Sequence, residues 1–132
     1  MNVNKTANLL INFTVKRLAE IFGIFVCIAG ILLLSSLLTY SPEDPNFIFD
    51  DNTKIKNILG FKGSLISDLF FQSIGLVSYL ISITLVITGI NIFKSKEFFL
   101  VIENIFFAII YSIIGTIFLA HFYKNSFTLY IN

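Results

Sequence analysis

Three long apolar runs, joined by two polar segments of unequal length, make up the pattern of hydrophobic and polar positions along this chain. The runs cover residues 21–40, 69–93 and 98–123, and the one acidic or basic side chain inside them, histidine aside, is Glu103. A helix rises about 1.5 Å per residue, so about 20 apolar residues cross the roughly 30 Å hydrocarbon core of a bilayer. The pattern therefore predicts an all-α integral membrane protein with three transmembrane helices over about 21–40, 69–93 and 98–123.

The composition agrees with a bilayer environment and excludes some other classes of protein. The 132 residues are 56% hydrophobic and 13% charged, with a mean hydropathy of +0.88, whereas soluble domains are about 45–50% apolar and about 25% charged. The net charge of +1 gives no strongly basic surface, so we expect the lipid bilayer, and no nucleic acid, as a partner of this chain. Cys27 is the only cysteine, which excludes a disulfide within the chain.

The polar segment 41–67 is predicted to be a turn-rich loop on one face of the membrane. Pro42 and Pro45 are the only prolines; they end the first run and favour consecutive turns, and a short helix is expected near 53–59. Asp68 is expected at the start of the second helix, where a carboxylate suits the helix dipole, with Ser64 or Ser67 as the N-cap. Residues 94–97 leave room only for a tight turn, which makes the last two helices an antiparallel hairpin.

The N-terminal segment 1–20 has two interpretations that stay open. It is either an interfacial helix whose basic groups face lipid head groups or a frayed lead-in to the first span. The first run is longer than the about 7–15 residues of a signal-peptide core and lacks an A-x-A cleavage site. We therefore expect an anchor that is not cleaved.

Orientation follows the lysines and arginines in short loops. One face would carry Lys5, Lys16, Arg17, Lys94 and Lys96. The other would carry Lys54, Lys56, Lys62 and Lys124. The basic flank of the first span and the short turn favour a cytoplasmic N-terminus, an outer loop 41–67, an inner turn 94–97 and an outer tail 124–132.

Few side chains could carry chemistry. Glu103 could serve a proton or ion relay, which would make the chain a small multi-pass transporter or channel subunit. It also lies near enough to the start of its run to reach the interface, or Lys94 and Lys96. His121 is the only histidine, and no metal-ligating cluster surrounds it. No phosphate-binding loop, HExxH, GxSxG or CxxC motif occurs, so we expect no enzymatic activity, catalytic residue, cofactor or metal in this chain.

Small residues recur at four-residue spacing in all three runs. They are Ala19 and Gly23 near the first, Ser78 and Ser82 in the second, and Ala108, Ser112, Thr116 and Ala120 in the third. Such faces let helix backbones approach closely, and the hydroxyls can bridge between helices. Two uses stay open, namely association between copies of the chain and packing within one copy.

The stretch from residue 39 to residue 89 resembles a known family. Residues 39–47 (TYSPEDPNF) resemble the SYxPxDPSF signature that follows the first membrane helix of FtsK/SpoIIIE-type DNA translocases. Residues 57–69 (NILGFKGSLISDL) are similar to the family's NxxGxxGAxxADxL lead-in to the second helix. The matching positions, to which we assign a structural role, are Tyr40, Pro42, Asp44, Pro45, Phe47, Asn57, Gly60, Gly63, Asp68, Gly75, Tyr79 and Gly89.

This resemblance implies a function. Proteins of the family have a four-helix N-terminal membrane domain that is targeted to the division septum, followed by a linker and a hexameric motor that pumps DNA. For this chain it implies membrane anchoring and septum recruitment in the bacterial inner membrane, in a process that couples chromosome segregation to cell division. The implied partners are other division proteins, bound through the membrane helices or the outer loop, and a homo-oligomer remains open.

The chain also departs from the family pattern. Ser82 stands where the family usually has proline. The fourth helix, the linker and the motor are missing from these 132 residues. We therefore expect either a piece of a longer reading frame or a stand-alone membrane protein, with anchoring and recruitment as the function carried over.

Overall fold

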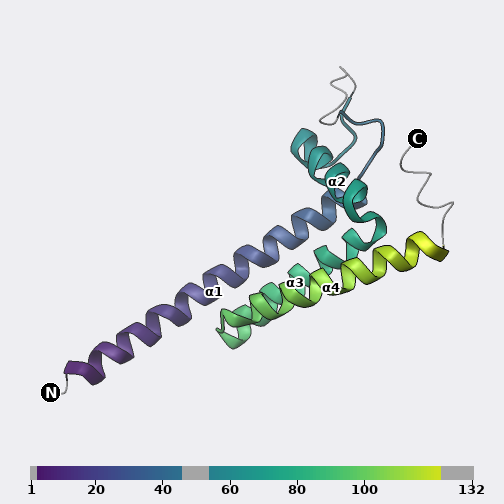
Figure 1. The fold of residues 1–132 in the computed structure, drawn as a ribbon. Coiled ribbons are helices and arrows are strands. Elements are labelled where there is room, and N and C mark those ends of the chain that lie inside the picture. The colour runs from purple at the N-terminus through teal and green to yellow at the C-terminus, as the bar shows by residue number, and fades with distance from the viewer. Residues whose placement is uncertain (1–2, 46–53, 123–132) are drawn as a thin grey trace.

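The computed structural model describes residues 3–45 and 54–122, and these are helical apart from the segments that connect the helices. The elements are α1 (Val3–Leu38), α2 (Gly60–Ile74), the single 3-10 turn η1 (Gly75–Val77), α3 (Ser78–Ser95) and α4 (Phe99–Phe122). Figure 1 shows α1, α3 and α4 running alongside one another, while α2 crosses the end of α1. The predicted all-α fold class is confirmed, and within the described ranges three helical stretches are long and apolar enough to cross a membrane: Ala7–Leu38, Gly60–Ser95 and Phe99–Phe122.

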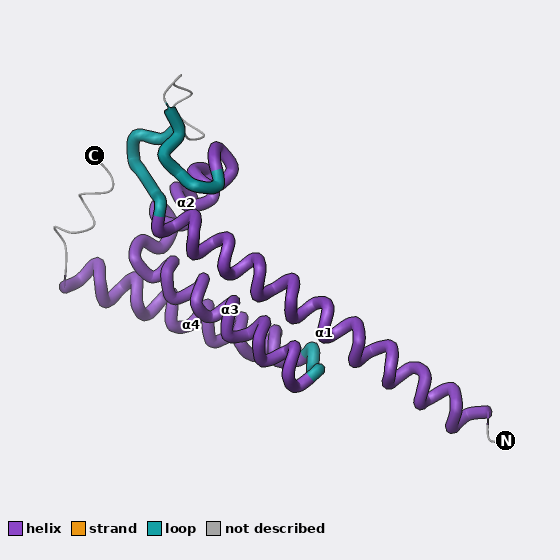
Figure 2. The backbone as a smooth tube through the Cα atoms, turned by 180° about the vertical axis from the view of Figure 1, so that it is seen from behind, coloured by secondary structure: helices purple, strands orange, loops and turns teal. Residues whose placement is uncertain are grey.

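The two ends of this bundle differ, and we name them by what they carry. The loop end carries the described residues 39–45 and 54–59 of the connection between α1 and α2. The turn end carries residues 96–98, which connect α3 to α4. In Figure 2 the loop end is the one where the teal connection of α1 to α2 lies.

The antiparallel pair α1 and α3 forms the tightest contact of the bundle. Both helices place glycine at their crossing: a Cβ atom added to Gly89 would lie 2.5 Å from the backbone nitrogen of Cys27, and one added to Gly23 would lie 2.7 Å from that of Phe93. Such backbone contact is typical of small residues in membrane helix pairs. Ala19, which is fully buried, extends the same contact toward the turn end. The small residues of the first helix therefore serve packing within the chain.

The first helix is longer than its apolar run. Residues 3–20 continue into the first apolar run as part of α1 and so do not form a separate helix. No glycine or proline interrupts this part of the sequence, which removes the usual causes of a helix break. As a result α1 extends past the turn end of the bundle, as Figures 1 and 2 both show.

The second apolar run is divided by a break. Helix α2 begins at Gly60, well before the predicted start at residue 69, and ends where Gly75 adopts φ 59° and ψ −137°. An L-residue with a Cβ atom rarely adopts this conformation. The chain changes direction there and continues through η1 into α3, which ends at Ser95 rather than at residue 93.

Two local predictions for this region are wrong. The described residues 54–59 are not helical, because the backbone N–H groups of Lys56 and Asn57 bond the carboxylate of Asp44 instead of helical carbonyls. The N-cap position of α2 is Leu59, with no side-chain cap. Ser64 and Ser67 lie inside the helix, and Asp68 lies near its middle rather than in its first turn.

The hairpin of α3 and α4 agrees with the short turn. Lys96 adopts a left-handed conformation with φ 61°, and its N–H bonds the carbonyl of Ile92 at 2.8 Å, which closes α3. Two hydrogen bonds join the helices: Asn104 Nδ2 donates to Thr88 Oγ1 at 2.8 Å, and the hydroxyls of Thr84 and Tyr111 lie 2.7 Å apart. Most of the surface of α4 is exposed, although Ser112 of its small face is buried.

Candidate functional site

The residues of the family signature gather mainly at the loop end, where they build a buried network of hydrogen bonds. We call this network the loop-end polar cluster. Its members are Ser36, Thr39, Tyr40, Asp44, Asn57, Ser64, Ser67 and Asp68. Three of them carry charged or amide groups and are almost fully buried, at exposed fractions of 5% for Asp44, 4% for Asn57 and 8% for Asp68.

Asp44 closes the loop. Its own N–H bonds the carbonyl of Ser41 at 3.1 Å, which makes residues 41–44 a turn with Pro42 in its second position. Its two carboxylate oxygens accept the backbone N–H groups of Lys56 and Asn57, each at 2.8 Å. Hydrogen bonds to an ionised acceptor are stronger than neutral ones. One buried side chain thereby fixes the two ends of the loop against each other.

A surface ion pair lies beside this closure. The ammonium of Lys56 contacts the carboxylate of Glu43, and both side chains are largely exposed. The hydrogen bond from Lys56 lowers the pKa of Glu43, and the same bond raises the pKa of Lys56. Because exposed pairs contribute little to stability, the backbone contacts of Asp44 carry the closure.

Asn57 connects the loop to the end of α1. Its Nδ2 donates to the carbonyl of Ser36 at 2.9 Å, and it lies 3.4 Å from Ser67 Oγ. Its Oδ1 accepts the N–H of Leu59 at 3.1 Å, and its carbonyl accepts the N–H of Gly60 at 2.9 Å. The last carbonyls of a helix lack partners within it, so Asn57 both satisfies one of them and sets the start of α2.

Serine and threonine hydroxyls add further connections. Ser36 Oγ donates to the carbonyl of Gly63 at 2.6 Å, and Ser64 Oγ donates to that of Pro45 at 3.0 Å. Thr39 Oγ1 accepts the N–H of Ile58 at 3.2 Å. Sequence reasoning did not assign Ser36 and Thr39 to the site. The available signal was a group of hydroxyl residues at the end of an otherwise apolar run.

Asp68 and the neighbouring aromatic rings attach α2 to α1 and α3. The hydroxyl of Tyr40 donates to Asp68 Oδ1 at 3.1 Å, and Gln72 Nε2 donates to Oδ2 at 2.7 Å. The ring of Phe71 lies between those of Tyr40 and Tyr79, at centroid distances of 4.6 and 5.6 Å. The hydroxyl of Tyr79 donates to the carbonyl of Leu37 at 3.1 Å, which satisfies a second carbonyl at the end of α1.

The remaining signature positions have separate places. Pro42 is exposed in the turn, and Pro45 is buried beside Ser64. Gly60 and Gly63 lie in the first turn of α2, Gly75 forms the break after it, and Gly89 lies against α1. Phe47 lies outside the described residues. The signature thus combines a buried polar network with the helix break and the tightest helix crossing. The carboxylate oxygens of Asp44 and Asp68 accept hydrogen bonds from the chain itself.

Comparison with known families decides where this arrangement belongs. Residues 15–131 match the family described as the 4TM region of DNA translocase FtsK/SpoIIIE. The chain belongs to this family. The resemblance inferred from the signature is therefore confirmed, and the FtsK/SpoIIIE membership together with three candidate spans identifies an inner-membrane protein.

Several curated relatives match this FtsK/SpoIIIE membrane region. The DNA translocase FtsK of Caulobacter vibrioides is 33% identical over 73 residues, which cover 55% of this chain and 9% of the relative. That of Shewanella oneidensis is 31% identical over 101 residues, 76% of this chain and 11% of the relative. That of Rickettsia bellii is 28% identical over 78 residues, 59% of this chain and 10% of the relative. The chain thus spans about a tenth of the length of these relatives. No solved structure matches it.

Glu103 and His121 do not join a site in this FtsK/SpoIIIE region. Glu103 is exposed on α4, and among the described residues Lys96 pairs with Glu20 at 2.9 Å and not with Glu103. His121 is exposed near the end of α4, with its ring against that of Phe122. Within the described ranges, no group of three histidine, cysteine or acidic residues could hold a metal ion.

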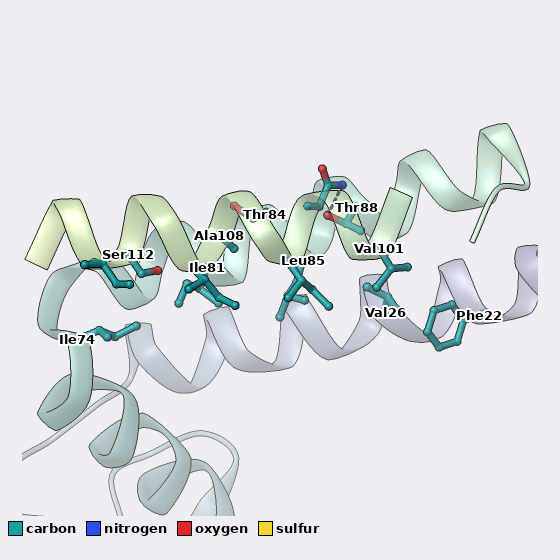
Figure 3. A pocket seen from close by; sticks show the side chains of 14 residues that line it. Phe22, Val26, Ile74, Ile81, Thr84, Leu85, Thr88, Val101, Ala108 and Ser112 are labelled. Carbon is teal, nitrogen blue, oxygen red and sulfur yellow. Dashed lines mark hydrogen bonds between the residues drawn. The ribbon is translucent and has the colours of Figure 1, made fainter. Parts of the chain in front are cut away.

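An apolar groove of about 600 Å³ lies between α1, α3 and α4. Figure 3 shows its walls, with Phe22 and Val26 from α1, Leu85 from α3 and Val101 from α4 among the lining side chains. Asn104 and Thr88, which are joined by a hydrogen bond, both belong to its lining. The lining offers few polar groups to a ligand, so the groove does not indicate a catalytic or ion-conducting site.

Proposed function

We propose that this chain anchors a cell-division DNA translocase in the inner membrane and recruits it to the division septum. Family membership supports the anchoring role, since the matching region is the membrane region of such translocases. The observation that carries the proposal is the loop-end polar cluster. It fixes the described flanks of the connection between α1 and α2, residues 39–45 and 54–59, against each other and against the end of α1. These flanks offer a defined surface outside the bilayer that a partner protein could recognise.

The proposed orientation places the N-terminus in the cytoplasm and the loop end on the outer side. Lys96 at the turn end pairs with Glu20 of α1, and Glu20 also pairs with Arg17 at 2.6 Å. This contact brings the basic flank of α1 and the turn before α4 to the same end of the bundle. The positive-inside rule then assigns that end to the cytoplasm.

Other division proteins are the proposed partners, bound at the loop end or along the membrane helices, and association between copies of the chain is a further proposal. This chain is not proposed to bind DNA, because its net charge is only +1. The DNA-translocating activity would belong to further polypeptide. Its presence can be tested by detecting the native protein in membranes with an antibody to the 41–67 loop. A band far above 14.9 kDa would show that the chain is part of a translocase.

The experiment for recruitment follows a fluorescent fusion of the native protein in dividing cells of its host. We expect a band of fluorescence at the septum. Asp44→Ala should leave the protein in the membrane but spread it over the cell envelope, because the loop loses its closure. Glu43→Gln, which changes an exposed neighbour, is the matched control and should keep the septal band. Even distribution of the unaltered protein would overturn the proposal.

A further inference from the structure

Helix α2 buries several polar side chains and exposes several large apolar ones, beside the exposed polar residues Lys62, Gln72 and Ser73. The buried residues are Gly63, Ser64, Ser67, Asp68 and Phe71. Three large apolar residues face outward, with exposed fractions of 45% for Phe61, 46% for Ile66 and 56% for Leu69. A helix on the surface of a water-soluble protein shows the opposite pattern, with its apolar stripe toward the core. The outward side of α2 therefore has the wrong composition for a surface in water.

The exposed apolar positions of α2 continue into the part of the chain that crosses the membrane. Leu76 in η1 and Leu80 in α3 follow Leu69 at intervals of seven and four residues, and they are 44% and 53% exposed. On the neighbouring helix, Leu38 at the end of α1 is 67% exposed. The exposed apolar positions thus run from α2 into α3, interrupted by the exposed Gln72 and Ser73 at the end of α2.

Exposed lysines lie in α2 and just before it. Lys62 lies between Phe61 and Gly63 and one helical turn before Ile66, which places it on the outward side. Lys54 is exposed in the segment just before α2. Lysine side chains can lay their apolar stems along a hydrophobic surface and extend the ammonium to the head groups. This pairing of apolar side chains with peripheral lysines is typical of helices that lie in a membrane interface.

We infer that α2 lies in the interface of the leaflet at the loop end, with Phe61, Ile66 and Leu69 among the upper acyl chains. Lys54 and Lys62 contact lipid phosphates. The membrane-crossing part of the second apolar stretch is then η1 and α3, of 3 and 18 residues, which suffice for the roughly 30 Å core. Figure 1 agrees with this division, because α2 crosses the end of α1 rather than extending the line of α3. The inference goes beyond the proposed function and requires only that the protein is in a membrane.

Depth-dependent quenching tests this inference. In a Cys27→Ala background, Ile66→Cys and Leu69→Cys are labelled with a polarity-sensitive fluorophore, and the purified protein is placed in vesicles of phosphatidylethanolamine and phosphatidylglycerol. The vesicles carry lipids with a spin label either near the head group or deep in the acyl chain. We expect a blue-shifted emission that the shallow label quenches more than the deep one. Ile113→Cys, an exposed position in the middle of α4, is the matched control and should be quenched more by the deep label.

Each other outcome overturns the inference in a distinct way. Unshifted emission at residues 66 and 69, with quenching by iodide in the buffer, would place this side of α2 in water. A blue shift without quenching by either lipid label would mean that protein covers it, either a second copy or another chain. Stronger quenching by the deep label would make α2 part of the span itself. Absence of lipid quenching at residue 113 as well would show that the protein is not inserted, and the proposed anchoring function would fail with it.

Discussion

The side-chain amide of Asn57 donates a 2.9 Å hydrogen bond to the backbone carbonyl of Ser36, which lies 21 positions earlier in the chain. This bond satisfies a carbonyl at the end of α1 with a side chain from the segment just before α2. It therefore joins the end of one candidate membrane span to the segment that begins the next. The loop between them is held at both sides, since Asp44 bonds the N–H of Asn57 itself.

Replacing Asp44 tests the closure of the loop. Asp44→Ala leaves two backbone N–H groups without their acceptor, and loss of hydrogen bonds to a charged group costs about 1.5–3 kcal/mol each. We expect faster proteolytic cleavage in the 41–59 region of the protein in vesicles, while the three spans stay protected. Because the Glu43–Lys56 pair is exposed and contributes little to stability, Glu43→Gln should be cleaved at a rate close to that of the unaltered protein. Equal protection of Asp44→Ala and the unaltered protein would show that the closure does not depend on this carboxylate.

Gly63 is expected to tolerate no side chain. A Cβ atom there would overlap the side chain of Asn57 and lie 2.5 Å from Leu59 Cβ. Asn57 cannot move aside without breaking its bond to Ser36, so Gly63→Ala should lower the melting temperature in detergent. Gly60→Ala is the matched comparison: its Cβ meets open space, but φ is +67°, which costs about 1–2 kcal/mol. A larger loss for Gly60→Ala than for Gly63→Ala would contradict the described packing.

Gly89 controls the crossing of α1 and α3. Gly89→Leu forces the two backbones apart, because even a Cβ would lie 2.7 Å from the carbonyl oxygen of Gly23. The native Cys27, half-buried at this crossing, reports the change, and its reaction with a maleimide should become faster. Gly115→Ala is the control, since its nearest neighbour is a methyl group of Val77 at 3.1 Å. Unchanged reactivity of Cys27 in Gly89→Leu would refute the crossing.

The hydrogen bond between Asn104 and Thr88 should contribute only modestly to the hairpin of α3 and α4. Hydrogen bonds between membrane helices average about 0.6 kcal/mol and reach about 1.7 kcal/mol. In a double-mutant cycle measured by unfolding in mixed detergent, Asn104→Leu and Thr88→Val should each destabilise the protein. The double variant should cost less than the sum of the two, because each single change leaves one polar group unpaired. Additive losses would mean that the two side chains do not interact.

The Glu43–Lys56 pair predicts a pH dependence in the loop. The pKa of Glu43 is lowered from 4.5. The stabilisation of the loop by its carboxylate is therefore fully present above about pH 4.5 and is lost as the pH falls through the folded pKa. The pKa of Lys56 is raised from 10.5. The stabilisation of the loop by its ammonium group is therefore fully present below about pH 10.5 and is lost as the pH rises through the folded pKa. Any difference in loop cleavage between the unaltered protein and Glu43→Gln should thus be largest between about pH 4.5 and 10.5 and should fade on either side of this range. If the two proteins still differed in cleavage rate in strong acid, the difference would have to come from a group other than Glu43.

The sequence by itself determined the membrane class, the number of candidate spans and the family. Apolar runs of at least 20 residues are long enough to cross a bilayer, whose hydrocarbon core covers their apolar side chains. The spacing of Tyr40, Pro42, Asp44 and the glycines by itself indicated the family. The short turn before residue 98 similarly required a hairpin, since four residues cannot reach across a membrane.

Only the tertiary structure decided the boundaries and the partners of the polar residues. Local pattern placed Asp68 and Ser64 at a helix start, yet both lie inside α2 and bond residues that follow α1. The break at Gly75 was not predicted. The pairing of Glu20 with Lys96 and the bond from Asn57 to Ser36 join residues far apart in sequence. Such contacts depend on how helices cross, and periodicity along one helix carries no information about the crossing. The exposed apolar residues of α2 likewise emerged only once several of its polar side chains were seen to be buried.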